Sequence, residues 1–249
     1  MAGHSQWKNI MYRKGAQDAR RAKLFTKLIR ELVVAARSGL PNPATNPRLR
    51  NAVLAAKAAN MPRETVERSI RRGAGASEGE PYEEIRYEGY GPGGAAIIVE
   101  ALTDNRNRTA AQLRAAFSKY GGSIGEPGSV SFLFNRVGMV SYPPEVADAE
   151  AMFEAALEAG ADDCESRDDG HEAIFALDRL GAARDALEAR FGPCQSARLT
   201  WRPQTTVRLG EEDTRSLLKL IEVLEDNDDV QLVSANFDIA DELMARLTT

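Results

Sequence analysis

The spacing of apolar residues changes at Gly73, and this change limits the folds that the chain can adopt. Up to Gly73, apolar residues recur only with the period of a helix. Beyond it, short apolar runs typical of strands alternate with helical segments. The first part predicts a small all-α module, and the second predicts α/β domains. Because 249 residues leave room for two or three domains, we expect a multidomain α+β protein.

Three helices are expected in the first part of the chain. Residues 18–37 predict an amphipathic helix, with apolar residues in one arc and cations on roughly the opposite arc, facing solvent. A second helix begins at Asn46 and Pro47, because asparagine caps helices and proline suits their first position. A third covers 63–72 and ends at the following glycine. Together they predict a basic helical domain at 1–75.

The second part of the chain predicts two α/β domains of ferredoxin-like type, one inserted in the other. Residues 137–202 follow the order strand–helix–strand–strand–helix–strand, which is the ferredoxin-like order. Residues 80–135 lack a helix and a strand, and 204–249 contain them. We therefore expect 80–135 and 204–249 to form one discontinuous domain, with 137–202 inserted between its halves. Within the first half, residues 129–134 predict a strand.

The charge of the chain reverses at the same place as the apolar pattern. Residues 1–73 hold 16 Lys and Arg against 4 Asp and Glu, a net charge of +12. Residues 74–249 hold 16 Lys and Arg against 33 Asp and Glu, a net charge of −17. This asymmetry indicates a basic module that binds a polyanion and an acidic body that stays off it. A solvated basic surface without a ligand is the alternative.

The basic module supplies the candidate contacts to nucleic acid. Lysines and arginines neutralise phosphates, and the aromatic residues among them can stack on bases. Trp7 has a second interpretation, in which it only anchors the N-terminus to the helical core. The candidate contacts are His4, Trp7, Lys8, Arg13, Lys14, Arg20, Arg21, Lys23, Lys27, Arg30, Arg48, Arg71 and Arg72.

A second candidate patch lies in the acidic body, in the segment TDNRNRT at 103–109. The segment predicts a loop between a strand and a helix, with Thr109 as the helix cap. Its arginines would point away from the end of the sheet, where ligands often bind. A capped loop with solvated arginines is the alternative. The residues of this patch are Asn105, Arg106, Asn107 and Arg108.

Catalytic, metal and membrane functions find little support in the sequence. The glycines of YGPGG at 90–94 are not followed by the lysine and hydroxyl of a phosphate-binding loop, so they predict a tight turn. A binding role for this turn is the alternative. A histidine base would have to be His4 or His171, both in segments expected to be flexible. Cys164 and Cys194 are expected to be reduced structural thiols. No apolar run approaches the ~20 residues that span a bilayer. We expect no enzyme, cofactor, metal, membrane partner or small-molecule substrate.

Several long strings identify a resemblance that covers essentially the entire chain. The chain resembles the YebC/PmpR family through MAGHSQWKNI, RKGAQDARRAKLFTKLIREL, NPRLRNAV, AANMP, YEGYGPGG, LTDNRNRT, FSKYGG and LEDNDDVQ, in this order. The resemblance implies three domains, one helical and two α/β, and a non-enzymatic cytoplasmic regulator. Family members are commonly described as DNA-binding transcriptional regulators.

The resemblance leaves two functions open. Mitochondrial relatives act as translational activators of cytochrome c oxidase, and bacterial members have been tied to ribosome function. The first expectation is a DNA-binding transcriptional regulator, whose cations lie along phosphates. The alternative is a translation factor that binds ribosomal RNA, and the ribosome with it. Phosphate contacts carry no sequence information, so the cations alone do not separate these functions.

Overall fold

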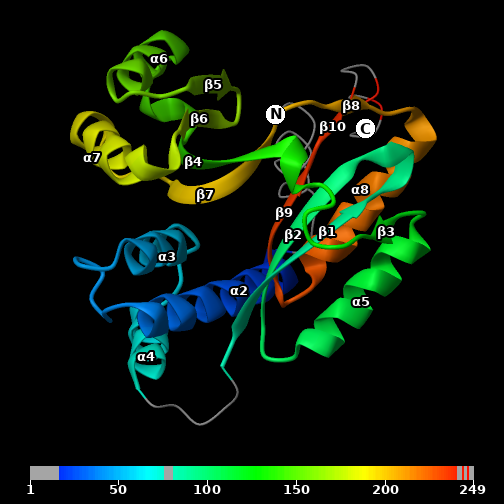
Figure 1. The fold of residues 1–249 in the computed structure, drawn as a ribbon. Helices are drawn as coiled ribbons and strands as arrows, with labels where there is room; N and C mark the ends of the chain where they lie inside the picture. The colour runs from blue at the N-terminus through cyan, green and yellow to red at the C-terminus, as the bar shows by residue number, and fades with distance from the viewer. Residues whose placement is uncertain (1–16, 76–80, 240–242, 244–245, 247–249) are drawn as a thin grey trace. The chain divides into compact units, whose positions relative to one another are not determined.

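The structure is a computed structural model that describes residues 17–75, 81–239, 243 and 246. The element order is helical at first and mixed afterwards, as Figure 1 shows. The helices are α2 (Gln17–Ser38), α3 (Pro47–Ala58), α4 (Arg63–Ala74), α5 (Arg106–Lys119), α6 (Ala149–Glu158), α7 (Leu180–Phe191) and α8 (Glu211–Asp226). The strands are β1 (Glu83–Tyr90), β2 (Ala96–Thr103), β3 (Ser123–Ile124), β4 (Phe134–Tyr142), β5 (Asp163–Arg167), β6 (Gly170–Phe175), β7 (Ser196–Pro203), β8 (Val207–Arg208), β9 (Val230–Ala235) and β10 (Phe237–Asp238). This is the α+β class that the sequence predicted.

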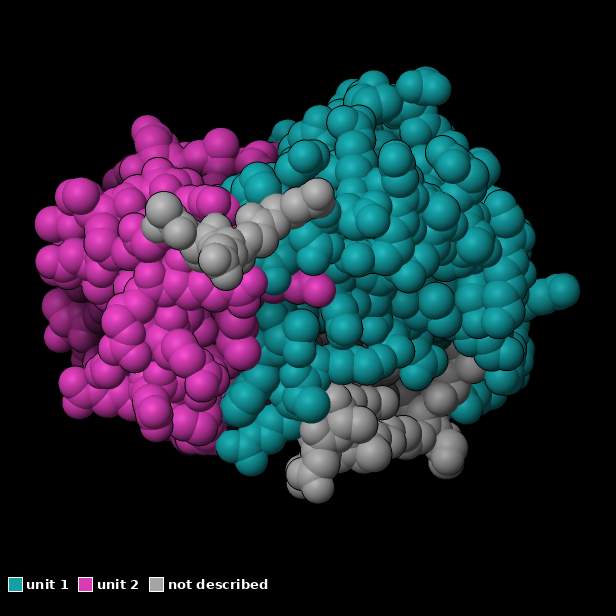
Figure 2. Space-filling model, turned by 90° about the horizontal axis from the view of Figure 1, so that it is seen from below, with its two compact units in different colours: residues 1–27, 78–135, 201–249 teal, residues 28–77, 136–200 magenta. Residues whose placement is uncertain are grey.

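The chain forms two compact units, which Figure 2 shows in different colours. The first unit holds residues 1–27, 78–135 and 201–249, and the second holds 28–77 and 136–200. The helical region from residue 28 onward therefore belongs to the same unit as the segment 136–200. The division into three domains remains a prediction.

The first unit is built on the sheet β3-β1-β2-β9. β2 lies between β1 and β9 and pairs antiparallel with both, so the last long strand of the chain completes a sheet begun before residue 103. Helices α5 and α8 cover one face of this sheet, where Leu113 and Phe117 pack with Leu217 and Leu224. β2 itself is a nearly continuous apolar run, AIIVEALT, and all of its residues except Glu100 are buried.

The second unit contains the sheet β5-β6-β4-β7, whose strand order is that of a ferredoxin-like unit. Helices α6 and α7 lie on one face, where Met152 and Leu187 pack against Tyr142 and Phe175. β5 and β6 form a hairpin closed at Arg167 and Gly170. Gly170 has a φ of 149°, a value that favours glycine at this turn.

The segment 129–134 differs from the strand predicted for it. A short 3₁₀ turn occupies Ser131–Leu133, and β4 begins only at Phe134. The cause is Glu88 of β1, whose Oε2 accepts hydrogen bonds from the backbone N–H groups of Val130 and Ser131, at 2.9 and 2.8 Å. Two donors bound to one carboxylate oxygen hold these residues in a turn, where a strand would direct successive N–H groups to opposite sides.

Candidate nucleic-acid interface

Helix α2 (Gln17–Ser38) forms as predicted, and its apolar residues enter the core of the helical region. Leu32, Val33, Ala35 and Ala36 are all buried. The helix ends at Ser38, directly before the glycine that follows it. This apolar face fixes the directions in which the cations of α2 point.

Two cations of α2 do not simply face solvent, contrary to the prediction. Lys23 pairs with the carboxylate of Asp226 and also donates to its carbonyl oxygen at 3.4 Å. Lys27 donates to the carbonyl oxygen of Glu225. Asp226 is the last residue of α8, where carbonyl groups have no partner within the helix and the helix dipole is negative. The two lysines therefore cap α8.

Arg48 of α3 and Arg21 of α2 also have partners. Arg48 binds Glu31 through two hydrogen bonds, Nε to Oε1 at 2.7 Å and Nη2 to Oε2 at 3.0 Å. This bidentate pair ties α3 to α2. Arg21 lies over the ring of Phe25, 5.3 Å from its centroid, and Arg30 is half-buried. These arginines therefore stabilise the helical region through their contacts, in addition to contributing positive charge.

An exposed cluster of guanidinium groups lies near the end of α4. Arg68, Arg71 and Arg72 are exposed, whereas Val66 and Gly73 on the same helix are buried. We name Arg68, Arg71 and Arg72 the α4 arginine cluster. Two of its members lie in the last turn of the helix, where cations are favourable.

Gly73 allows α4 to pack closely against α2 while the α4 arginine cluster remains exposed. A Cβ added at Gly73 would lie 2.4 Å from the carbonyl oxygen of Val33 and 2.8 Å from Cβ of Ala36. Helix α4 therefore approaches α2 more closely than any other residue would allow. The glycine was predicted to end the helix, but α4 continues to Ala74, because close packing is what requires glycine here.

Part of the predicted interface lies outside the described residues. His4, Trp7, Lys8, Arg13 and Lys14 belong to the segment 1–16. The backbone of Arg20 lies within α2, but its side chain is also outside the description.

The second patch is a helix start, where the sequence predicted a loop. α5 begins at Arg106, and Asn105 caps it by accepting a hydrogen bond from the N–H of Arg108 at 3.0 Å. Thr109 was predicted to be the cap, but it lies within the helix and is fully buried. The hydroxyl of Thr109 belongs instead to the polar network described next.

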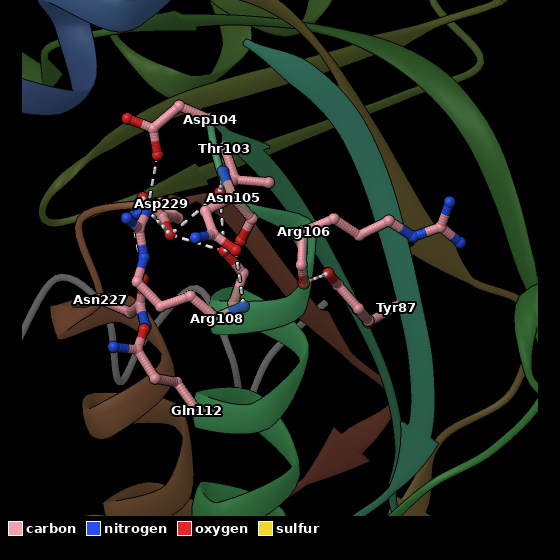
Figure 3. A network of polar contacts seen from close by, with 10 residues as sticks. Tyr87, Thr103, Asp104, Asn105, Arg106, Arg108, Gln112, Asn227 and Asp229 are labelled. Atoms are coloured by element: carbon pink, nitrogen blue, oxygen red, sulfur yellow. Dashed lines mark hydrogen bonds and ion pairs between the residues drawn. The ribbon is translucent and has the colours of Figure 1, made fainter. Parts of the chain in front are cut away.

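That network centres on Asp229, which sequence analysis missed (Figure 3). Asp229 is 3% exposed. Its carboxylate accepts hydrogen bonds from Arg108 at 2.9 Å, from Thr109 at 2.6 Å and from Thr103 at 3.3 Å. It stands in the acidic turn after α8, where neighbouring carboxylates are exposed, so its position in the sequence gave no signal of burial.

Arg108 is therefore held in ion pairs, and its side chain remains 42% exposed. Besides Asp229, it pairs with Asp104 at 2.8 Å. The hydrogen bonds to Asp229 and Asp104 raise the pKa of Arg108, so the guanidinium stays charged at every physiological pH. The buried carboxylate thus has the cationic partner that burial demands.

Arg106 has a different position. Figure 3 shows its side chain extending away from Asp229, and it is exposed. Its carbonyl oxygen accepts a hydrogen bond from the hydroxyl of Tyr87 at 3.5 Å. Burial raises the pKa of Tyr87, and the positive charges of Arg106 and Arg114 oppose that rise, which places both arginines near the phenol. Helix α5 contains Arg106, Arg108, Arg114 and Lys119 and no acidic residue.

Other candidates for chemistry are structural. His171 is buried in β6, where its Nδ1 contacts the hydroxyl of Ser166 at 2.7 Å, so the expectation of a flexible segment was wrong. Burial raises the pKa of Cys164 to about 11 and of Cys194 to about 12, which keeps both thiols protonated at neutral pH. The YGPGG glycines form the predicted turn, with φ of 66° at Gly93 and 76° at Gly94.

The described residues also bear on membrane and metal functions. None of the described helices is long and apolar enough to span a bilayer. Within the same residues, His, Cys, Asp and Glu side chains nowhere gather in threes with a geometry that would hold a metal ion.

Comparisons with known proteins cover almost the entire chain. Residues 5–76 match the model of the TACO1/YebC protein N-terminal domain, and residues 82–237 match that of the TACO1/YebC second and third domain. A crystal structure of a conserved hypothetical protein from Aquifex aeolicus is 47% identical in sequence. The match has a TM-score of 0.87 and covers 92% of this chain and 94% of that one.

Proposed function

Because the chain belongs to the TACO1/YebC family, we propose that it is a non-enzymatic regulator that binds nucleic acid, and that its ligand is DNA. The observation that carries this proposal is the α4 arginine cluster. It is exposed on a helix that Gly73 holds tightly against α2, in the part of the chain whose net charge is +12. An ordered array of guanidinium groups fits the regularly spaced phosphates of a nucleic acid.

Binding to phosphates predicts a characteristic dependence on salt. The logarithm of the affinity for duplex DNA falls with the logarithm of salt concentration, by a slope of about −0.9 for each phosphate neutralised. The variant Arg71→Gln/Arg72→Gln removes two charges of the α4 arginine cluster. Its slope should be shallower than that of the unaltered protein by about 1.8. Fluorescence anisotropy with a labelled duplex measures both slopes.

The matched control is Arg63→Gln on the same helix. Arg63 is exposed but pairs with Glu67 four residues later, at 2.7 Å, and lies at the opposite end of α4. It should bind DNA with the affinity of the unaltered protein. Equal salt slopes for the cluster variant and the unaltered protein would remove the α4 arginine cluster from the interface.

Reversal of Lys23, Lys27 and Arg30 is a less useful test. Lys23 and Lys27 cap α8, so glutamates there would repel the negative end of that helix. A loss of binding in such a variant would combine a lost contact with a disturbed fold.

We also propose that α5 offers a second contact to phosphates, through Arg106 and Arg114. Arg106 is exposed, both lie near Tyr87, and α5 carries no acidic residue. Arg108 takes no part, since Asp104 and Asp229 hold it. The variant Arg106→Gln/Arg114→Gln should weaken DNA binding without lowering thermal stability. Unchanged binding would confine the interface to the basic helical region.

A translation factor that binds ribosomal RNA is the second candidate. The net charge of −17 over residues 74–249 favours it, because an acidic body suits the basic proteins that surround ribosomal RNA. Ultraviolet crosslinking in cells, followed by sequencing of bound DNA and bound RNA, separates the two. Enrichment of a few promoters supports the transcriptional role, and crosslinks at one ribosomal RNA position would replace it with the translational one.

A further inference from the structure

Helix α6 (Ala149–Glu158) presents an apolar row that the fold does not bury. Met152, Ala155 and Ala156 face the sheet and are at most 4% exposed. Beside this buried stripe, Phe153 is 52% exposed and Leu157 is 62% exposed. They are four residues apart, so their side chains lie beside each other along one line of the helix.

A row of carboxylates runs parallel to this apolar row. Glu150, Glu154 and Glu158 follow the same spacing of four residues, and all three are exposed. Glu150 and Glu154 stand three residues before Phe153 and Leu157, so the two rows are neighbours around the helix. Helix α6 contains no lysine or arginine. We name this surface, formed by Phe153, Leu157, Glu150, Glu154 and Glu158, the α6 face.

The fold gains little from the two apolar side chains of the α6 face. More than half of each remains in water, so their contribution to the free energy of folding is far below that of the buried Met152. Single exposed apolar residues are common, but a large aromatic and a leucine that adjoin each other form a patch. Such patches with polar rims are typical of protein–protein interfaces.

We propose that the α6 face binds a basic amphipathic segment of another protein. The occupant would carry apolar side chains beside a row of lysines or arginines, matching the two rows of α6. Charge complementarity supports this choice, since the apolar pair is flanked by carboxylates on a helix without cations. Rows at four-residue spacing are also the ridges through which two helices pack.

The arrangement of charge separates this function from nucleic-acid binding. Three carboxylates at the edge of the α6 face repel phosphates, whereas the α4 arginine cluster attracts them. One of the three, Glu158, also pairs with Arg190 of α7 at 3.1 Å. Glu150 and Glu154 are therefore the carboxylates best placed to receive cations from a partner.

The test uses the full chain and a synthetic peptide. The probe is a fluorescein-labelled peptide of about 18 residues, long enough to form a helix, with leucines and lysines in adjacent rows and alanine elsewhere. Its affinity is measured by anisotropy at about 0.15 M salt, where exposed charges more than about 8 Å apart are largely screened. Phe153→Ser/Leu157→Ser should weaken binding about tenfold, as truncation of interface anchors does. Glu150→Gln/Glu154→Gln should weaken it too and reduce its dependence on salt.

The control variant is Val223→Ser on α8, a helix that is also rich in carboxylates. Val223 is 40% exposed and stands next to Glu222, but it has no apolar neighbour of the kind that Phe153 has in Leu157. It should bind the probe like the unaltered protein. Circular dichroism checks that every variant is folded.

Four results would overturn the proposal. The first is that the unaltered protein does not bind the peptide, and the second is that the Phe153→Ser/Leu157→Ser variant binds it equally well. The third is that a peptide whose leucines are replaced by alanine binds equally well. The fourth is that the unaltered chain self-associates and the Phe153→Ser/Leu157→Ser variant does not. The second and third would leave only unspecific attraction between charges. The last would make a second copy of the chain the occupant of the α6 face.

Discussion

Arg106 and Arg108 are two residues apart and carry the same charge, yet their side chains have different roles. Arg108 neutralises the buried carboxylate of Asp229, whereas the side chain of Arg106 extends away from it. Only tertiary structure separates them, because the two arginines look alike in the sequence NRNR. Arg106 is therefore a candidate for binding phosphates, whereas Arg108 stabilises the start of α5.

Replacement of Arg108 should therefore destabilise the fold. Arg108→Ala removes the ion pair between Arg108 and the buried carboxylate of Asp229, which should cost about 2–3 kcal/mol of unfolding free energy. Arg106→Ala, the matched control, should change that free energy by less than about 0.5 kcal/mol. Urea unfolding at neutral pH measures both, and equal losses would contradict the separate roles of the two arginines.

The pKa of Glu88 predicts that the stability of the protein depends on pH. Burial alone would raise the pKa of its carboxyl, but the N–H groups of Val130, Gly128 and Ser131 outweigh that effect and lower the pKa below its usual 4.5. A lowered pKa in the folded state stabilises the protein above the unfolded value. That contribution is lost as the pH falls through the folded value.

The variant Glu88→Gln tests this. At neutral pH it should be less stable than the unaltered protein by about 1–2 kcal/mol, because a charged acceptor of two N–H groups is lost. Below pH 4.5 the difference should shrink as Glu88 itself becomes protonated. Unfolding free energies near pH 7 and near pH 3 provide the comparison, and a constant difference would exclude Glu88 as the titrating group.

Among the elements, helices were easier to predict from the sequence than the places where strands begin. Asn46 and Pro47 start α3 as expected, because both signals are local. The segment 129–134 was mistaken for a strand because its apolar residues alternate, and the carboxylate that bends it comes from Glu88, more than forty residues earlier. Lys23 and Lys27 of α2 were expected to face solvent, and their partners on α8 could not be read from local spacing.

Gly73 gives a prediction for the packing of α4. In an exposed helix, alanine in place of glycine raises stability by about 1 kcal/mol. Here Gly73→Ala should lower it, by about 1–3 kcal/mol, because the new methyl group would overlap the backbone of Val33. Thermal unfolding is the measurement, with Gly75→Ala as the control, since a Cβ there meets its nearest neighbour at 3.5 Å. An increase in melting temperature for Gly73→Ala would show that α4 can move away from α2.

At the scale of the molecule, the helical region and the ferredoxin-like sheet share a unit through a buried arginine. Arg184 of α7 is 4% exposed, and its Nη1 donates to Oδ1 of Asn51 in α3 at 3.1 Å. The variants Asn51→Ala and Arg184→Leu, alone and combined, should show a coupling energy of about 1 kcal/mol. Additive effects in urea unfolding would mean that the hydrogen bond contributes nothing to holding the two parts together.

The sequence indicated the overall composition of the molecule better than its internal connections. The reversal of charge and the strand–helix order were visible without a structure, because both are summed over many residues. The contact between Asn51 and Arg184 gave no such signal, because the sequence does not show whether an arginine is buried or exposed. Contacts between residues more than a hundred positions apart depend on the packing of whole elements, which spacing along the chain does not encode.

The place of β2 between β1 and β9 has a consequence for the way the chain is made. While the polypeptide is being synthesised, β1 and β2 emerge early, but the strand that closes the other edge of β2 starts only at Val230. Throughout that interval β2 keeps one edge unpaired, and its apolar side chains lack α8. An open apolar strand edge recruits other strands. A nascent chain that stopped before Val230 would thus lack the edge strand β9 and would have a strong tendency to aggregate.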